Sequence, residues 1–534
     1  MADGEKLFNL LDEPWILVRK NSGETAEVSL LDALIHAHEY DALAGELPTQ
    51  DVAILRLLLA VLYTVFTRYN ADGSEREDVP DFDDMVDMWK EVWDSGYLPE
   101  QPIREYLGKW HELFWLFHPE RPFYQANSAK MGTEYTAAKL NGEISESSNK
   151  VRLFTKRTGM VKKELTFSEG ARWLLYLNGY DDTSSKPKGK DLPSPGAGWL
   201  GKLGLIWAAG ANLYETLMLN LSFPDGASDE WYENQPIWER DVYPDKERVK
   251  IPLPTNPAEL YTLQSRRILL IHNRNLVIGY KLLGGDFFDR EGAFSEQMTI
   301  WRPIYERKEI VGYQPKRHDS TKQLWREFSS IAVGSENKMP GIVTWQAFLR
   351  ENELIPEEKL CRFDITSVQY GDKDFFVDDV FSDSITFNID ILTKTGVIYR
   401  SLIETEIARC DKFADVLKSL ASDLIKASGG DPTALGAYAK EQYYYRIDGE
   451  LRRWIASVSP SQSDTEINES RESWRNRNKQ IALELGSELI HKMSSDAFVG
   501  REIKDKKGSK EVKYHYSIPE AEIRFIHNIK HIDD

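Results

Sequence analysis

The chain has few cysteines, no long apolar run and no leader-like start. Cys361 and Cys410 are its only cysteines, so it can form at most one disulfide and cannot build a cysteine-based zinc site from them alone. No uninterrupted apolar run reaches the roughly 18 residues that span a bilayer. The first residues, MADGEKLFNLLDEPW, carry acids where a signal peptide has a basic start and an apolar stretch. We therefore expect a soluble, cytoplasmic protein.

The usual catalytic signatures are absent as well. The sequence has no G-x-x-x-x-G-K-[ST] loop for nucleotide phosphates, no G-x-S-x-G nucleophile elbow and no H-E-x-x-H zinc motif. His318–Asp319 is the only adjacent His-Asp pair, and the acids Asp81, Asp83 and Asp84 lack the ligand spacing of a calcium loop. We expect no catalytic centre, no metal and no cofactor.

Apolar and aromatic residues, in contrast, are plentiful. The 534 residues are 41% apolar and 11% aromatic, with 15 Trp, 24 Tyr and 22 Phe. This composition supports a packed interior and excludes a mostly disordered chain. At about 100–200 residues per domain, the length predicts roughly three domains, and in any case more than one hydrophobic core.

Charge is unevenly distributed along the chain. Lys and Arg number 67 against 86 Asp and Glu, a formal net charge of −19, and a uniformly acidic surface would repel nucleic acid. However, Lys150–Lys163 contains six basic residues and no acid, and Arg266–Lys281 contains four and no acid, whereas Asp72–Asp84 contains seven acids. Basic islands on an acidic body fit a protein that contacts nucleic acid locally, or one with solvated surface loops.

The N-terminal part predicts a mixed fold. Asp51–Tyr69 carries apolar residues at a spacing of three and four on more than one face, which indicates a central helix. Residues 141–168 read as a long loop, and residues 181–204 contain three Pro and five Gly and cannot form regular structure. From Ile206 to about Gln369, short strand-like runs alternate with turns, which indicates an α+β body.

Beyond about Ser384 the pattern becomes purely helical. Helices are predicted over about Phe387–Lys426, Pro432–Val458, Asp464–Met493 and Pro519–Ile532, each with an amphipathic pattern. Four such helices with modest connections indicate a four-helix bundle. The fold class is therefore α+β, with a large mixed N-terminal domain at residues 1–383 followed by an all-α four-helix bundle at residues 384–534.

Two loops have the composition of nucleic-acid contacts. In residues 181–204, glycines let the main chain approach a groove or phosphate closely, and nearby lysines supply charge. These residues are Gly189, Gly196 and Gly198 with Lys186, Lys188, Lys190 and Lys202. In Lys150–Lys163, basic residues surround Phe154, which suits stacking on a base. The alternatives are a flexible connector for the first loop and a core residue of a short strand for Phe154.

Four segments, in order along nearly the whole chain, resemble one known family. They are Asn9–Val18 (NLLDEPWILV), His118–Gln125 (HPERPFYQ), Glu233–Trp238 (ENQPIW) and Glu441–Arg446 (EQYYYR). Together they resemble the CasA family, the large subunit of the type I-E CRISPR surveillance complex Cascade. The resemblance implies a non-enzymatic protein that recognises the short protospacer-adjacent motif (PAM) in double-stranded DNA, promotes duplex opening for guide-RNA pairing, and helps recruit a helicase–nuclease in antiviral defence.

The resemblance also implies partners. They are the guide RNA, the other Cascade subunits (backbone, small and handle-binding), the target double-stranded DNA and the recruited helicase–nuclease. Some relatives carry a small cysteine cluster that this chain lacks, so no zinc is expected.

The resemblance implies four sets of site residues. A PAM loop within Lys186–Gly198 would contact the minor groove through Lys188, Gly189, Lys190, Gly196 and Gly198. A wedge beneath the PAM would consist of Gly371, Asp372, Lys373 and Asp374. A lysine finger would be Lys281 or Arg290. A guide-RNA loop would contact the 5′ handle through Lys150, Arg152, Phe154, Lys156, Arg157, Lys162 and Lys163.

Two other functions are compatible with the residues. A metal-dependent DNA nuclease would use His318–Asp319 together with carboxylates, and it needs about three or four acids or histidines converging on a metal pair. A protein-interaction scaffold would use the bundle as its interface and make no contact with DNA.

Overall fold

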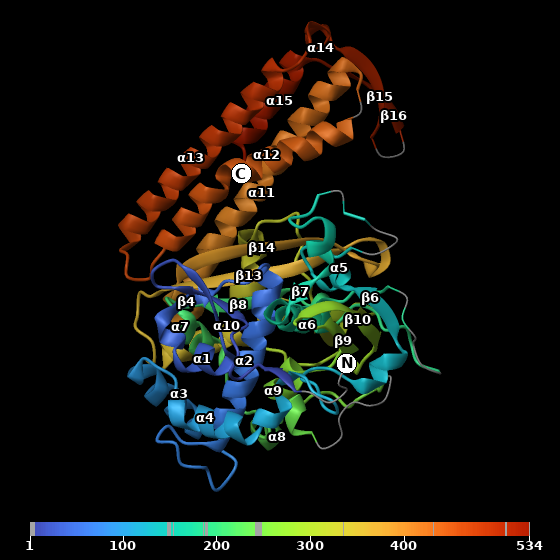
Figure 1. The fold of residues 1–534 in the computed structure, drawn as a ribbon. Helices are drawn as coiled ribbons and strands as arrows, with labels where there is room; N and C mark the ends of the chain where they lie inside the picture. The colour runs from blue at the N-terminus through green and yellow to red at the C-terminus, as the bar shows by residue number, and fades with distance from the viewer. Residues whose placement is uncertain are drawn as a thin grey trace. The chain divides into compact units, whose positions relative to one another are not determined.

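The computed structural model describes most of the chain. The described residues are 6–146, 151–152, 154–184, 186, 191–240, 248–334, 336–430, 432–507 and 510–532, and at 432–434 and 504–512 the description covers the backbone alone. The chain divides into two compact units. The first consists of residues up to Lys322 with Ser330–Leu349 and Cys361–Ser384, and the second of Gln323–Ser329, Arg350–Leu360 and residues from Ile385 on. Helices and strands both contribute, which confirms the α+β class (Figure 1).

A long apolar helix, α2 (Pro48–Arg68), forms the centre of the first unit (Figure 1). Proline at its first position fits a helix start, where no backbone N–H is needed, and Tyr69 is its C-cap. By length and composition α2 is apolar enough to cross a membrane, but 94% of its most apolar window is buried inside the protein. The helix packs against α6 (Phe167–Tyr180) and α9 (Pro257–Tyr261), as expected of a core helix.

Two antiparallel sheets carry the regions of functional interest. In one, β10 (Leu276–Gly284) pairs with β6 (Thr133–Thr136), β7 (Leu165–Thr166) and β9 (Arg266–Asn273). In the other, the order is β14-β13-β8, with β8 at Leu205–Ala209, β13 at Leu360–Tyr370 and β14 at Val377–Asn388. The turn between β13 and β14 contains the expected wedge residues.

The remaining strands of the first unit form small antiparallel sheets. They are β1 (Leu7–Asn9) with β5 (Trp115–Phe117), β2 (Ile16–Lys20) between β3 (Thr25–Val28) and β4 (Tyr40–Leu43), and β11 (Trp301–Glu306) with β12 (Glu309–Pro315). The other helices are α1 (Leu30–Ile35), α3 (Phe82–Ser95), α4 (Glu100–Lys109), α5 (Ala137–Leu140), α7 (Leu213–Asn220), α8 (Asp229–Tyr232) and α10 (Gly341–Glu351).

The second unit is built around long helices that lie side by side (Figure 1). They are α11 (Val397–Ser428), α12 (Pro432–Ser457), α13 (Asp464–His491) and α15 (Ile518–Lys530). Ser463 caps α13 with a reciprocal bond to Glu466, and Gly429 ends α11 in the left-handed conformation at φ 84°. The four helices expected from the sequence are therefore present.

Three features of the second unit differ from the sequence-based expectation. A strand hairpin, β15 (Arg501–Lys507) and β16 (Lys510–Tyr516), follows the short helix α14 (Ser495–Val499), where only helices were expected. Charged residues dominate this segment and hide the strand alternation. The first long helix begins at Val397 rather than near Phe387, because β14 runs on to Asn388. The division expected at 383/384 also omits the two earlier segments of the second unit.

Candidate nucleic-acid interface

The segment expected to act as the wedge, Gly371–Asp374, is a tight turn with an unusual backbone. Lys373 (φ 56°) and Asp374 (φ 56°) are both left-handed although neither is glycine. This conformation is costly for residues with a Cβ, so surrounding contacts must hold it. Two backbone bonds close the turn, from the N–H of Gly371 to the Phe376 carbonyl at 2.9 Å and from the N–H of Asp374 to the Gly371 carbonyl at 3.0 Å. The Lys373 side chain is exposed at the tip.

A guanidinium holds the wedge from one side. Both terminal nitrogens of Arg317 donate to the two carboxylate oxygens of Asp374 at 2.9 Å each. Arg317 also lies over the Tyr370 ring, 5.2 Å from its centroid. A guanidinium that donates two hydrogen bonds to one carboxylate fixes the relative orientation of the two groups as well as their distance. Arg317 therefore fixes the conformation of the turn that presents Lys373.

The residues that lead into the PAM loop hold the wedge from the other side. The N–H of Thr183 donates to the Asp374 carbonyl at 2.9 Å, and its Oγ1 donates to the Lys373 carbonyl at 2.8 Å. Ser184 Oγ reaches the Phe375 carbonyl at 3.4 Å. Thus the entrance of the PAM loop and the wedge, about 190 residues apart in sequence, form one structural element.

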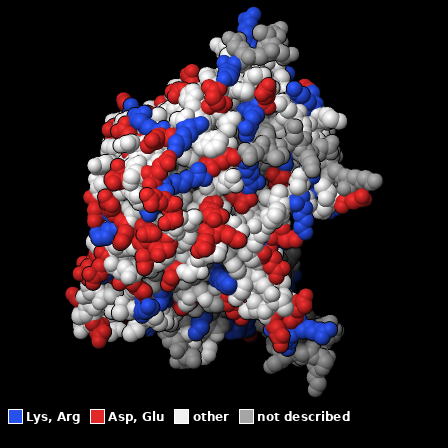
Figure 2. Space-filling view, turned by 90° about the horizontal axis from the view of Figure 1, so that it is seen from below, with Lys and Arg blue, Asp and Glu red and all other residues white. Residues whose placement is uncertain are grey.

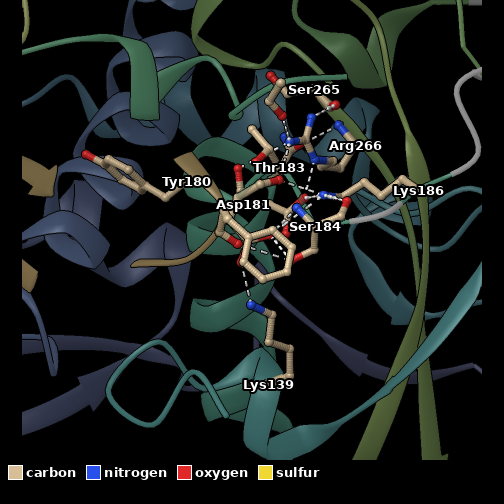
Figure 3. Close-up of polar contacts among 12 residues, drawn as sticks. Lys139, Tyr180, Asp181, Thr183, Ser184, Lys186, Ser265 and Arg266 are labelled. Atoms are coloured by element: carbon tan, nitrogen blue, oxygen red, sulfur yellow. Dashed lines mark hydrogen bonds and ion pairs between the residues drawn. The ribbon is translucent and has the colours of Figure 1, made fainter. Parts of the chain in front are cut away.

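Asp181 and Asp182, directly before Thr183 in the chain, belong to a buried cluster of charges (Figure 3). Arg266 and Lys186 both contact the Asp181 carboxylate, the latter at 2.8 Å, and Lys139 donates to Asp182 at 2.6 Å. Burial raises the pKa of Asp181, but the cations Lys186, Arg266 and Lys139 outweigh it and leave the pKa lowered. These opposite charges compensate each other, so the cluster anchors the loop entrance.

This cluster corrects one expectation about the PAM loop. Lys186 was expected to supply charge to DNA, but its side chain is buried against Asp181. Lys188, Gly189 and Lys190 lie outside the described residues. The expected PAM contacts that the structure describes are therefore Gly196 and Gly198.

The two described glycines have different roles. Gly196 is left-handed at φ +66°, no atom lies within 4 Å of where its Cβ would be, and its carbonyl accepts from Arg266 at 2.6 Å. Gly198 is buried, and a Cβ there would collide with the carbonyl of Gly179. Gly198 therefore serves close packing against the end of α6, and Gly196 is the glycine with open space beside it.

The two lysine-finger candidates lie in different surroundings. Lys281, on β10, donates to the Lys130 carbonyl at 3.2 Å and lies 3.9 Å from Glu134 on β6. Arg290 is exposed, and partial burial together with the charges of Arg302 and Arg317 lowers its pKa. Arg317, one of the charges that lower the pKa of Arg290, is also the partner of Asp374.

The loop expected to contact guide RNA presents an exposed aromatic ring. Phe154 is 93% exposed, so the alternative that placed it in a core is wrong. Three other apolar side chains of the loop are also exposed: Val151, Met160 and Val161. Arg152 reaches the carbonyl of Val377 at 2.8 Å, and Lys150 lies outside the described residues.

Acids of the same unit neutralise several cations of this loop. Lys156 pairs with Glu143, Arg157 with Glu169 and Lys162 with Glu146. Lys162 and, more weakly, Lys163 lower the pKa of Glu146. The loop is thus held against its own unit, and a nucleic-acid phosphate would have to compete with these carboxylates.

The residues of the nuclease alternative do not converge. His318 Nε2 lies 3.0 Å from the Leu205 carbonyl, while Asp319 accepts from Thr321 and pairs with Lys322. Among the residues that the structure describes, no group of three or more His, Cys, Asp and Glu side chains is placed to hold a metal ion. The clustering that a two-metal nuclease requires is therefore missing from the described part of the chain.

Acidic side chains are spread across the face shown in Figure 2, with basic side chains scattered among them on the described residues. This pattern agrees with the net charge of −19 and restricts favourable contacts with DNA to local sites.

Sequence reasoning missed Thr183, Arg317 and Phe375. Phe375 directly follows Gly371–Asp374 in the chain, and its ring is 47% exposed. Arg317 stands in the basic run Lys316-Arg317-His318 directly after β12, a signal that could have been noted. No sequence signal could have paired Thr183 with a turn so distant in the chain.

Comparisons with known proteins agree along the whole chain. Residues 9–485 match the family described as CRISPR-associated protein Cse1. The CRISPR-associated protein CasA/Cse1 of Thermus thermophilus is 26% identical over 505 residues, which cover 89% of this chain and 91% of that protein. The crystal structure of Thermobifida fusca Cse1 is 27% identical, with a TM-score of 0.81 over 100% of this chain and 99% of that one.

A chain of a structure described as a CRISPR RNA-guided surveillance complex shares the fold, with a TM-score of 0.64 at 16% identity over 91% of this chain and 100% of that one. The family match covers most of the sequence and confirms the family to which the sequence motifs pointed. The chain therefore belongs to the CRISPR-associated protein Cse1 family, the CasA family of Cascade large subunits.

Proposed function

We propose that this protein recognises the PAM in double-stranded DNA and promotes duplex opening for guide-RNA pairing, as a non-catalytic subunit of Cascade. The observation that carries the proposal is the pair of hydrogen bonds from Thr183 to the Lys373 and Asp374 backbone. Because they join the PAM loop entrance to the wedge, a loop that reads the PAM and a turn that separates the strands would act at adjacent base pairs.

Two side chains at the wedge suit strand separation. Lys373 offers an exposed cation to the DNA backbone, and Phe375 offers a partly exposed ring. Apolar and aromatic side chains that insert between base steps unstack and kink a duplex. The left-handed backbone at Lys373 and Asp374 is held by Arg317 and Thr183, so the turn is pre-organised before DNA arrives.

Guide-RNA binding is a second part of the proposal. The exposed Phe154 among basic residues supports stacking on a base of the 5′ handle. Family membership and the likeness to a chain of an RNA-guided surveillance complex support assembly with the other Cascade subunits. Recruitment of the helicase–nuclease and a cytoplasmic location are included in the proposal on the strength of family membership alone.

The test of PAM recognition uses Cascade reconstituted with wild-type or variant subunit. Gly196→Asp places bulk and negative charge where the structure has open space, so it should abolish the preference for a PAM-containing duplex. Gly198→Asp is less informative because it would collide with Gly179 inside the protein. Gly23→Asp is the matched control, since Gly23 is also left-handed and open but lies in the β2–β3 turn.

The measurement is the affinity for duplexes with and without the PAM and for a pre-melted bubble. A Gly196→Asp complex that keeps full PAM discrimination would overturn the assignment. A complex that binds every DNA equally well, with wild-type or variant subunit, would favour the scaffold function.

A further inference from the structure

Lys202 is a cation with no carboxylate partner in the part of the chain that the structure describes. It lies in the single turn Leu200–Lys202 that follows the PAM loop, and its side chain is partly buried. Among the described residues, no carboxylate lies within ion-pairing distance of it, in contrast to Arg266, which pairs with Asp181, and Arg317, which pairs with Asp374. Charges taken out of water are ordinarily paired, so an uncompensated one requires a reason.

The surroundings of Lys202 are positive. Burial lowers the pKa of Lys202 to about 8, and the charges of Arg266, Arg290, Arg248 and Arg317 contribute to the same shift. The charged form of Lys202 is therefore disfavoured by its surroundings. A bound anion would offset both the cost of desolvation and the repulsion from the neighbouring cations.

Arg248 shares a small pocket with Lys202, together with Pro195 and Ala197 of the PAM loop. Its terminal nitrogens donate to the carbonyls of Pro193 and Ser194, and its guanidinium lies 4.1 Å from the centroid of the Phe287 ring. Its Nε is buried and has no hydrogen-bond partner within the described ranges.

The charge of the pocket is not compensated. Its one carboxylate, Asp286, already accepts from Arg267 at 2.5 Å. Among the residues that the structure describes, the two pocket cations Lys202 and Arg248 thus have no carboxylate partner.

The small size of the pocket limits which chemical groups can enter it. Its free volume is about 10 Å³, which is close to the least that admits one water molecule. A base or a nucleoside cannot enter, whereas one oxygen of a phosphate can seat at the mouth. Pro195 and Ala197 line this pocket, and Gly196, with open space beside it, lies between them in sequence, so the phosphate of a DNA strand that passes the loop is within reach.

We propose that Lys202 and Arg248 bind a backbone phosphate of the DNA duplex beside the PAM loop. The proposal rests on the proposed function and adds to it a contact that is independent of sequence. Phosphate contacts position a protein on DNA, and the loss of one weakens binding to all duplexes equally. Discrimination between duplexes with and without the PAM would come from the PAM loop.

Lys202→Met in reconstituted Cascade tests the site. It should lower the affinity for duplexes with and without the PAM by the same factor, and it should reduce the slope of log affinity against log salt by about one. The free subunit should melt at a higher temperature than wild type, because the variant removes an unpaired, partly buried cation. Lys90→Met, on α3 and paired with Asp94, is the control and should change neither slope nor discrimination.

The pH dependence separates a phosphate contact from a merely structural one. Free Lys202 loses its proton above about pH 8, and a bound phosphate would raise its pKa, so wild-type affinity should fall between pH 8 and 9.5. Lys202→Arg keeps its charge, so its DNA affinity should vary less with pH than that of wild type. Lys202→Met should bind DNA weakly, with an affinity that does not change over this pH range. A wild-type profile that matches both variants would overturn the proposal.

Inorganic phosphate distinguishes the two sources of this anion. If phosphate raises the melting temperature of the wild-type subunit and not of Lys202→Met, while the DNA salt slope is the same for both, the site binds free anions and the DNA assignment is wrong. If Lys202→Met leaves salt slope and pH profile unchanged while Gly196→Asp still abolishes PAM discrimination, the phosphate site fails and the proposed function stands.

Discussion

Arg317 forms a bidentate ion pair with Asp374, in which each terminal nitrogen donates to a different carboxylate oxygen at 2.9 Å. Asp374 belongs to the turn that exposes Lys373. Both partners are about one-third exposed, so the pair contributes only about 1 kcal/mol to the stability of the unit. Its larger consequence is geometric, because it holds a left-handed turn that would otherwise relax.

Arg317→Lys should therefore impair duplex opening more than folding. Lysine keeps the charge but cannot meet the Asp374 carboxylate at two points. We expect a melting temperature within a few degrees of wild type and a reduced rate of opening on PAM-containing duplex. Binding to the pre-melted bubble should be unchanged, and a loss of bubble binding equal to that of duplex binding would contradict a positioning role.

Lys373→Ala should cost about 1–2 kcal/mol in duplex binding and lower the salt slope by about one, since one exposed cation is removed. Lys373→Gly is the matched variant. It removes the same cation but suits φ 56°, so it should stabilise the free subunit while it reduces opening as much as alanine does. If the glycine variant opens DNA as wild type does, the cation has no role in the wedge.

Phe375→Ala should reduce opening without changing the salt slope. The ring is 47% exposed and carries no charge, so its contribution would come from stacking against unpaired bases. Strand separation can be followed by the fluorescence of 2-aminopurine next to the PAM. An unchanged opening amplitude would remove Phe375 from the wedge.

Phe154→Ala should weaken guide-RNA binding by about 1–3 kcal/mol, the usual loss for one base–aromatic stack. Because the side chain is 93% exposed, the free subunit should melt as wild type does. Tyr445→Ala, 79% exposed on α12, is the control for loss of an exposed ring. Equal incorporation of both variants into Cascade would argue against the stacking role.

Asp51 gives a prediction about stability and pH. Burial raises its pKa to about 7, although the N–H of Gly45 donates to it at 2.7 Å. Since the folded-state pKa exceeds the unfolded value of about 3.9, the folded protein holds the extra proton and loses stability as pH rises from about 4 to 7. Asp51→Asn should raise the melting temperature at pH 8, and the exposed Asp83→Asn should not.

Periodicity in the sequence predicts the elements that depend on local pattern. The central helix α2 and the long helices of the second unit follow from apolar spacing, and ordered motifs such as Glu233–Trp238 indicate the family. The hairpin Arg501–Tyr516 is not predicted, because charged residues interrupt the alternation of polar and apolar residues that normally indicates a strand. The start of α11 is displaced because β14 continues the sheet through residues that also suit a helix.

The candidate site is harder to predict, because its contacts are long-range. Thr183 reaches Lys373 across 190 residues, and Lys186 looks like a free cation in sequence but is buried against Asp181. Gly196 and Gly198 are equivalent in sequence, yet only the structure shows that the second is required for packing. Burial and ion pairing decide which charged side chains stay exposed and unpaired, and neither can be read from composition.

The most direct measurement is 2-aminopurine fluorescence beside the PAM in Cascade that carries wild-type, Thr183→Val or Gly23→Asp subunit. Thr183→Val removes the bond to the Lys373 carbonyl and keeps the shape of the side chain. If loop and wedge act as one element, Thr183→Val should bind PAM duplex but open it more slowly, and Gly23→Asp should behave as wild type. Opening by Thr183→Val at the wild-type rate would contradict the joint action of loop and wedge.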